Sequence, residues 1–256
     1  MIDPGYIEAF GLHLARASAL VVASPLLGTA SELQGYKVAL IVSFAVTSFA
    51  LSGGPLAIDP DTLTFAVMAM RELAIGLTLA FFLHLIMAAL RVGTELVGQE
   101  MAFTLAGTVD PMTGNSNPPL TYLYEVLFYL ALLSVNGHHW LVRGLMASYE
   151  RAPVGALPLG ASVPGLIVSF FSETFSAGIA FAAPVLVLLF MVSILIAILA
   201  RAVPQINVLE FGFSARILTG LIGLALFAPI ITPAFTRLLE RLMRGLDAGL
   251  DALGTA

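Results

Sequence analysis

The sequence predicts an all-α integral membrane protein. Of its 256 residues, 59% are hydrophobic and only 11% are charged, against about 25% charged residues in soluble domains. The segment Thr174–Ala200 has no charged side chain, and at about 1.5 Å per residue it is long enough to cross the hydrocarbon core. A polar break at Arg201–Asn207 precedes a second apolar run, Val208–Phe235. These segments predict a helical hairpin with Pro204 at its tip, because proline lacks a backbone N–H.

Composition and motifs exclude several other classes of protein. The chain has no cysteine, which excludes disulfides and thiolate metal sites, and its net charge of −5 shows no basic stripe for nucleic acid. No nucleophile elbow, zinc-protease motif or phosphate-binding loop is present. His138 and His139 are adjacent, so on a helix they point about 100° apart and do not share a metal. We therefore expect no enzymatic activity, cofactor or metal, and we expect the amino terminus to belong to the mature chain.

The first two apolar runs are Tyr6–Gly28 and Val38–Leu51. The first run contains three ionisable residues, and it has an alanine at every fourth position. These alanines either form a stripe on which another helix packs closely, or they occur simply because alanine is common in the chain. The second is too short to cross alone, so we expect it to lean on other helices. The residues concerned in the first run are Glu8, His13 and Arg16, with Ala15, Ala19 and Ala23.

A third segment runs from Thr62 to about Phe103, longer than one span. It carries Arg71-Glu72, and then Arg91 and Glu95 at the spacing of an i,i+4 ion pair. Charges at the bilayer centre cost about 2.5 to 3.5 kcal/mol each, so Arg71 and Glu72 should face protein or water. They form either an ion pathway or a structural contact between subunits. The structural contact is favoured, because no second acidic residue recurs to make a relay.

The segment Met101–Pro119 predicts a loop, since it is rich in glycine, threonine, asparagine and proline. It is either a solvent-side connection, which the residues alone favour, or a pore-lining element. Two further apolar runs, Leu120–Val135 and Leu141–Tyr149, follow, and then the proline-rich linker Arg151–Pro164. After the hairpin come a basic amphipathic helix end, Arg237–Arg244, and a fraying tail. Arginines at both ends of the last helix leave its orientation weakly specified. The arginines at the other end of the last helix, opposite Arg237–Arg244, are Arg201 and Arg216.

Several short motifs occur together in one order along the chain. They are Glu72-x-x-x-Gly76, Gly98-Gln-Glu-Met101, Asp110-Pro111, Gly137-His138, Ser148, Pro153-x-Gly155 and Pro204-Gln-Ile-Asn207. In that order and spacing the sequence resembles the FliR family of flagellar export-gate proteins, which has injectisome equivalents in type III secretion systems. The hairpin, with Ala182-Ala-Pro-Val-Leu and a return from Ile217, is also similar to the small partner protein FliQ.

The resemblance implies one subunit of a helical export-gate pore. FliP and FliQ would complete a hetero-oligomeric ring, FlhB would pack at its cytoplasmic entrance, and unfolded flagellar subunits would pass outward through the inner membrane at the basal body. Residues 1–155 would be a FliP-like part and residues 156–256 a FliQ-like hairpin.

The resemblance also assigns roles to residues. The loop of about 101–119 would be a pore plug, the hairpin tip would contact partners, and the charges within apolar helices would contact protein or the channel. The plug residues are Met101, Phe103, Leu105, Gly107, Asp110, Pro111 and Met112. The tip residues are Pro204, Gln205, Ile206 and Asn207. The charged residues are Arg71, Glu72, Arg91, Glu95 and Arg201.

Two other functions stay open at this point. A small-solute secondary transporter would use Arg71-Glu72 and Arg91-Glu95 as its binding site, and it would work as a monomer or homodimer. A lipid-modifying enzyme would need a reactive cluster that the sequence does not contain.

Overall fold

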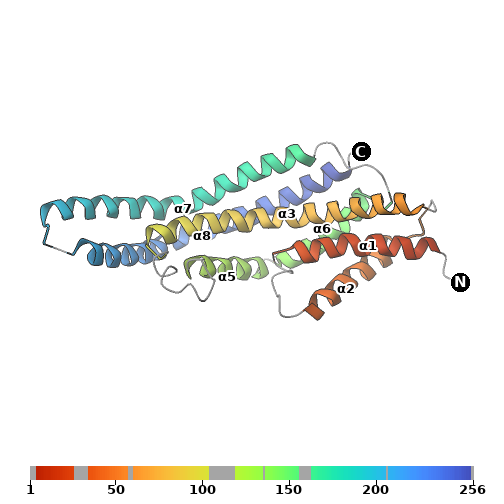
Figure 1. Cartoon of the computed structure of the whole chain (residues 1–256), viewed down its shortest axis with the longest axis horizontal. Helices are drawn as coiled ribbons and strands as arrows, with labels where there is room; N and C mark the ends of the chain where they lie inside the picture. Colours follow the sequence, from red (N-terminus) through yellow and green to blue (C-terminus); the bar gives the residue numbers. More distant parts are fainter. Residues whose placement is uncertain are drawn as a thin grey trace. The chain divides into compact units, whose positions relative to one another are not determined.

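The architecture is all-α, as predicted. A computed structural model of the chain describes residues 4–25, 34–56, 60–103, 119–134, 136–155, 163–205 and 207–254. All regular structure within these ranges is helical (Figure 1). The helices are α1 (Pro4–Ala23), α2 (Gln34–Ser52), α3 (Thr62–Glu100), α5 (Pro119–Ser134), α6 (Gly137–Arg151), α7 (Val163–Ala202) and α8 (Val208–Gly254).

Five helices in the described ranges are long and apolar enough to cross a membrane, and α5 with α6 would together make a sixth span. One of the five is Gly35–Ser52 in α2. The prediction that the second run is too short to cross is therefore wrong. The helix includes polar residues before Val38, such as Gln34 and Lys37, which a count of apolar residues alone leaves out.

The predicted hairpin is present, but both of its helices are longer than expected. Helix α7 has 40 residues and begins at Val163, so it takes in the last residues of the predicted linker. Helix α8 has 47 residues and runs to Gly254. The expected fraying of the tail is thus wrong as far as Gly254. The Arg151 guanidinium donates to Asp251 at 2.9 Å, an exposed ion pair between the end of α6 and this end of α8.

The chain divides into two compact units. Unit 1 comprises Met1–Leu85, Leu133–Ser172 and Arg241–Ala256, and unit 2 comprises Ile86–Leu132 and Glu173–Glu240. Spatial units of this kind do not test the proposed FliP-like and FliQ-like sequence parts, so that division stays a prediction.

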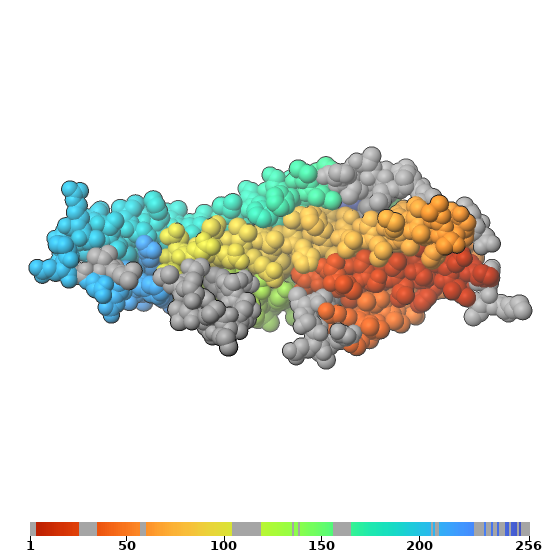
Figure 2. Space-filling model, viewed as in Figure 1, coloured from red at the N-terminus to blue at the C-terminus, as the bar shows by residue number. Residues whose placement is uncertain are grey.

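In unit 1, α1 and the first half of α3 lie side by side, as Figure 2 shows in red and orange. Gly76 makes this approach possible, since a Cβ there would lie 2.5 Å from the Arg16 carbonyl oxygen and 2.7 Å from the Ala19 side chain. Ala19 belongs to the predicted small-residue stripe, and here it does meet another helix closely. In unit 2 a glycine also allows two helices to approach closely, because a Cβ on Gly178 of α7 would lie 2.4 Å from the Ala89 carbonyl oxygen of α3.

The two ends of α3 are set by local hydrogen bonds. At its start the Asp61 carboxylate accepts the Thr64 N–H at 3.0 Å. Hydrogen bonds from the Thr64 hydroxyl and N–H hold the pKa of this carboxyl below its usual value. At its end, Ala102 N–H donates to Gln99 and Phe103 N–H donates to Gly98, both at 2.9 Å. This pairing is a Schellman motif, in which the left-handed position is usually glycine. Here it is alanine, with φ 63°.

Candidate functional site

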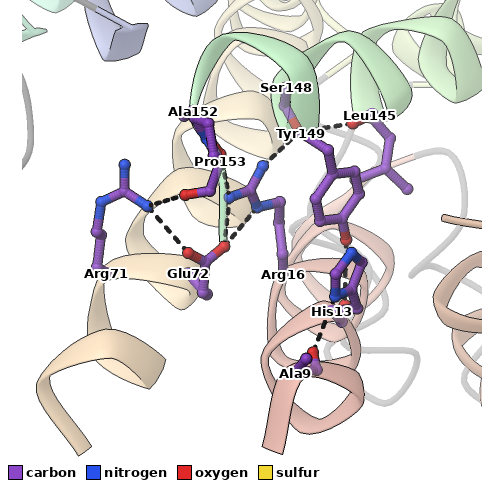
Figure 3. A network of polar contacts seen from close by, with 10 residues as sticks. All are labelled: Ala9, His13, Arg16, Arg71, Glu72, Leu145, Ser148, Tyr149, Ala152 and Pro153. Atoms are coloured by element: carbon purple, nitrogen blue, oxygen red, sulfur yellow. Dashed lines mark hydrogen bonds and ion pairs between the residues drawn. The ribbon is translucent and has the colours of Figure 1, made fainter. Parts of the chain in front are cut away.

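A buried polar cluster joins three helices of unit 1 (Figure 3). Arg16 of α1 and Glu72 of α3 are both 0% exposed and form an ion pair, in which Arg16 Nε donates to Glu72 Oε2 at 2.7 Å. Arg71 lies beside them and donates to Glu72 Oε1 at 3.0 Å. One carboxylate therefore faces two guanidinium groups, and the cluster carries a formal charge of +1.

The end of α6 completes the cluster with oxygen acceptors. Arg16 donates to the Ser148 hydroxyl at 3.0 Å and to the Ala152 carbonyl at 2.8 Å. Arg71 donates to the Pro153 carbonyl at 3.1 Å. Because buried charges need hydrogen bonds as well as opposite charge, these acceptors explain why two arginines are tolerated with one carboxylate. The motifs Ser148 and Pro153-x-Gly155 thus lie beside Glu72-x-x-x-Gly76.

Aromatic side chains cover one side of the cluster. The Arg16 guanidinium lies over the Tyr149 ring, 4.2 Å from its centroid, a favourable cation–π geometry. Tyr149 stacks on His13 with centroids 4.6 Å apart, and its hydroxyl donates to the His13 carbonyl at 3.2 Å. His13 Nδ1 donates to Ala9 at 2.8 Å. Its Nε2 and the Arg71 Nε are buried without a partner among the described residues.

The cluster is a structural junction. Arg71 and Glu72 are buried, as expected, and the contacts that the structure describes for them are with residues of their own chain. A contact of these residues with another subunit stays a prediction. No group of three potential metal ligands lies within the described ranges. The arrangement can hold α1, α3 and α6 in register, and every carboxylate oxygen in it already accepts a hydrogen bond.

Arg91 forms its ion pair with a different residue from the one expected. Its Nε donates to Glu125 of α5 and not to Glu95 on its own helix. The predicted Arg91–Glu95 pair is therefore wrong. Glu125 lies on α5 beside the second half of α3, where Thr94 also meets Thr121 with 3.3 Å between their hydroxyl oxygens. Sequence spacing predicts partners within one helix, but it does not predict a partner 34 residues away.

The proposed plug is described only at its first residues. Met101 is fully buried and packs against Gly220 of α8, where a Cβ would lie 2.5 Å from the Met101 sulfur. Phe103 is partly exposed at the end of the Schellman motif. The other proposed plug residues, Leu105, Gly107, Asp110, Pro111 and Met112, lie outside the described residues.

The hairpin tip is exposed to solvent at Arg201, Pro204, Gln205 and Asn207. Asn207 caps α8: its side-chain oxygen accepts the Glu210 N–H at 3.4 Å, and its amide donates to the Glu210 carboxylate at 3.2 Å. Asn207 is thus a side-chain N-cap, and the second hydrogen bond joins its side-chain amide to the Glu210 side chain. Capping thus accounts for Asn207, while contact of the tip with partners stays a prediction. Ile206 lies outside the described residues.

Sequence reasoning noted Arg16 as a charge within an apolar run but did not identify its partner. The signal was present, because a buried arginine in such a run needs a carboxylate, and Glu72 is one of few carboxylates within apolar segments. Tyr149 was not singled out, and no feature of its local sequence marks it.

Comparison with known proteins assigns the chain to a family. Residues 7–242 match the model of bacterial export proteins, family 1. The flagellar biosynthetic protein FliR of Escherichia coli (strain K12) is 27% identical over 230 residues, 89% of this chain and 87% of that protein. The FliR of Bacillus subtilis (strain 168) is 29% identical over 226 residues, 87% of each chain.

A third relative is the flagellar biosynthetic protein FliR of Aquifex aeolicus (strain VF5). It is 30% identical over 195 residues, which cover 76% of this chain and 74% of that protein. Together with the family match over 7–242 and the membrane-length helices, these similarities give the class of the molecule. The chain belongs to the bacterial export proteins of family 1, the FliR family, and is a membrane-embedded component of a flagellar export apparatus.

Proposed function

We propose that the chain is an export-gate subunit of the flagellar type III secretion apparatus in the bacterial inner membrane. Together with FliP and FliQ it forms the pore through which unfolded flagellar subunits pass outward, and FlhB packs at the cytoplasmic entrance. Other components of the apparatus supply the driving force, and no enzymatic step belongs to this chain. The flagellar relatives support a flagellar role over an injectisome role.

The observation that carries this proposal is the match of residues 7–242 to the family of bacterial export proteins. The exposed surface of α7 is consistent with it. Exposed large apolar residues recur from Val168 to Ile198, about 45 Å along the helix, whereas the hydrocarbon core is about 30 Å thick. The exposed Glu173 and the in-helix Pro184 interrupt this stretch, and in the proposed ring neighbouring subunits cover the part that lies outside the lipid.

The end of α3 supports a plug role for the segment that follows it. Met101 is held in the interior of unit 2 against Gly220, so the chain leaves α3 from a fixed point. Methionine side chains are deformable, and in the proposed gate Met112 and the other apolar residues of the segment that follows Met101 seal the closed pore. Apolar constrictions resist wetting, which keeps such a pore tight to ions.

A small-solute transporter finds less support. Its proposed binding charges are occupied within the chain, since Glu72 is paired with Arg16 and Arg71, and Arg91 is paired with Glu125. Both oxygens of the Glu72 carboxylate already accept hydrogen bonds, and Arg71 and Arg91 are each engaged by carboxylates of the same chain, so these groups are already in use before a solute arrives.

Co-purification tests the assembly. The tagged chain is produced with and without the FliP and FliQ proteins of the same genome and is extracted in mild detergent. We expect a stable hetero-oligomer containing all three proteins. Recovery of the chain alone, in a form that binds a small solute in a calorimetric titration, would replace the gate by the transporter.

A deletion tests the plug separately. Removing Ala106 to Asn115 should leave the hetero-oligomer intact and make the reconstituted complex leak small ions in a conductance assay. A deletion complex that stays as tight to ions as the native complex would exclude the plug role while leaving the assembly in place.

A further inference from the structure

His84 is an ionisable side chain in the most apolar part of α3. It is the only ionisable residue between Glu72 and Arg91, and it lies about 18 Å along the helix from the first and about 10 Å from the second. It is exposed on the surface of unit 1. An imidazole is too short to reach the bilayer interface from this depth, unlike lysine or arginine.

His84 has no partner within the part of the chain that the structure describes: no hydrogen bond, ion pair or ring contact of its side chain is found there. His13 is different, because its ring donates to Ala9 and stacks on Tyr149. Ionisable groups in membrane helices pair with other groups or face water. The imidazole of His84 is therefore satisfied either by water or by a partner from outside the described residues.

The position of His84 continues a regular pattern. Leu63, Met70 and Leu77 precede it at intervals of seven residues and are 73%, 69% and 51% exposed. Leu73 and Phe81, on the same side, are also exposed. In coiled coils a heptad stripe of this kind packs against another helix, and a single polar residue at such a position fixes the register of the pair. His84 is the polar member of this stripe.

A shallow groove of about 340 Å³ surrounds His84. Its walls come from the end of α1, from α3 and from the beginning of α7, all within unit 1. The groove is almost wholly apolar apart from His84 and the Thr78 hydroxyl, and Thr78 already donates to Ala74 at 2.8 Å. His84 is thus the open polar group of the groove. The lining residues are Ala23, Leu77, Thr78, Phe81, His84 and Ile167.

We propose that this groove and the heptad stripe of α3 receive an apolar membrane helix of a neighbouring subunit, which presents one oxygen acceptor to the His84 imidazole. The acceptor is a carboxyl, carboxamide or hydroxyl group. Lipid chains offer no acceptor at this depth, whereas interhelical hydrogen bonds of this kind hold membrane helices together. The inference rests on the proposed function for the existence of that neighbour, and it adds where the neighbour binds and what chemistry it carries.

Two substitutions separate the hydrogen bond from the shape of the groove. His84→Leu keeps an apolar surface and removes the donor, while His84→Gln keeps a donor and an acceptor at similar length. Each variant is produced with the FliP and FliQ proteins of the same genome, and the yield of hetero-oligomer per tagged chain is measured. We expect the yield to fall roughly threefold or more for His84→Leu, the effect of one interhelical hydrogen bond, and to stay near native for His84→Gln.

The thermal stability of each isolated variant in detergent is the control for folding. Since His84 is exposed, His84→Leu should unfold at the native temperature or above it. Native yield with His84→Leu would overturn the inference and leave the proposed function standing. An equal loss with both variants would also overturn it, because the loss would not depend on the hydrogen bond. Failure of the native chain to form any hetero-oligomer would reject the proposed function, and the inference with it.

Discussion

Two arginines share one carboxylate in the interior of unit 1. Arg16 and Arg71 both contact Glu72, and backbone carbonyls with one hydroxyl take up the remaining donors. In such an arrangement the loss of the anion costs more than the loss of one contact, because it leaves two desolvated cations close together. Stability at this position therefore depends on charge more than on volume.

Glu72→Gln tests this dependence, since glutamine nearly keeps the shape and removes the charge. We expect a loss of about 3–5 kcal/mol in unfolding free energy, the usual effect of removing one partner of a buried pair. The measurement is thermal or denaturant unfolding of the purified chain in detergent. Arg201→Gln at the exposed hairpin tip is the matched control and should have little effect. A Glu72→Gln chain as stable as the native one would contradict a structural role for the ion pair.

Ala102 is strained for a residue with a Cβ. It occupies the left-handed position of the Schellman motif that ends α3, with φ 63°. We expect Ala102→Gly to raise the unfolding free energy by about 1 kcal/mol, since glycine adopts this conformation without the Cβ clash. Ala88→Gly, in the interior of α3, is the control and should lower the unfolding free energy by about 0.5–1 kcal/mol. Unfolding midpoints that shift in the same direction for both variants would rule out strain at Ala102.

At the scale of helices, glycine controls how closely elements approach. Gly76 lets α1 lie against α3, because a Cβ there would lie 2.5 Å from a backbone oxygen that cannot rotate away. Gly144 in α6 has open space around its Cα. Gly76 is thus tightly surrounded and Gly144 is not, although both lie inside helices. Substituting each by alanine compares the effect of close packing with the effect of helix propensity alone.

Gly76→Ala should separate α1 from α3 and destabilise the chain by about 1–3 kcal/mol, as overpacking does. Gly144→Ala should be neutral or stabilise it by up to about 1 kcal/mol, because alanine is the better helix former. Unfolding in detergent measures both. If Gly76→Ala has no more effect than Gly144→Ala, the close approach of α1 and α3 is not required for stability.

The helices themselves were largely predictable, because apolar runs and proline or glycine breaks are local features. The hairpin break at Pro204 and the long α3 are examples. The start of α2 was missed because Gln34–Lys37 is polar. The end of α8 was missed because it packs against residues distant in sequence, with Gly249 close to Phe82. Partners in the cluster were not predictable from spacing, since Arg16 and Glu72 are 56 residues apart. The only feature of the sequence that suggests their pairing is that both charged residues lie within apolar segments.

At the scale of the whole molecule, the exposed apolar face of α7 exceeds what one bilayer covers. Val168 and Ile198 are both exposed and lie about 45 Å apart along the helix. A straight helix at ordinary tilt would not place both of them within the hydrocarbon core, about 30 Å thick, and Pro184 lies between them. In the proposed ring, protein covers the remainder.

Single cysteines test this coverage, because the natural chain contains none. In cells lacking FliP and FliQ, at least one of Val168→Cys and Ile198→Cys should react with a water-soluble maleimide. With both partners present, both positions should be protected. Leu189→Cys, at a fully buried position on the same helix, should stay unreactive in either strain. Protection of both test positions without partners would show that lipid alone covers α7.

The last turns of α8 have a consequence for biosynthesis. Gly245 and Gly249 lie so close to Phe170 and Phe82 that a Cβ on either would meet the ring at 2.2 Å or 2.6 Å, and the two rings meet edge to face. Residues near position 82 leave the ribosome long before position 249 is translated. The nascent chain therefore enters the membrane with this aromatic pair uncovered, and its final packing waits until the end of translation.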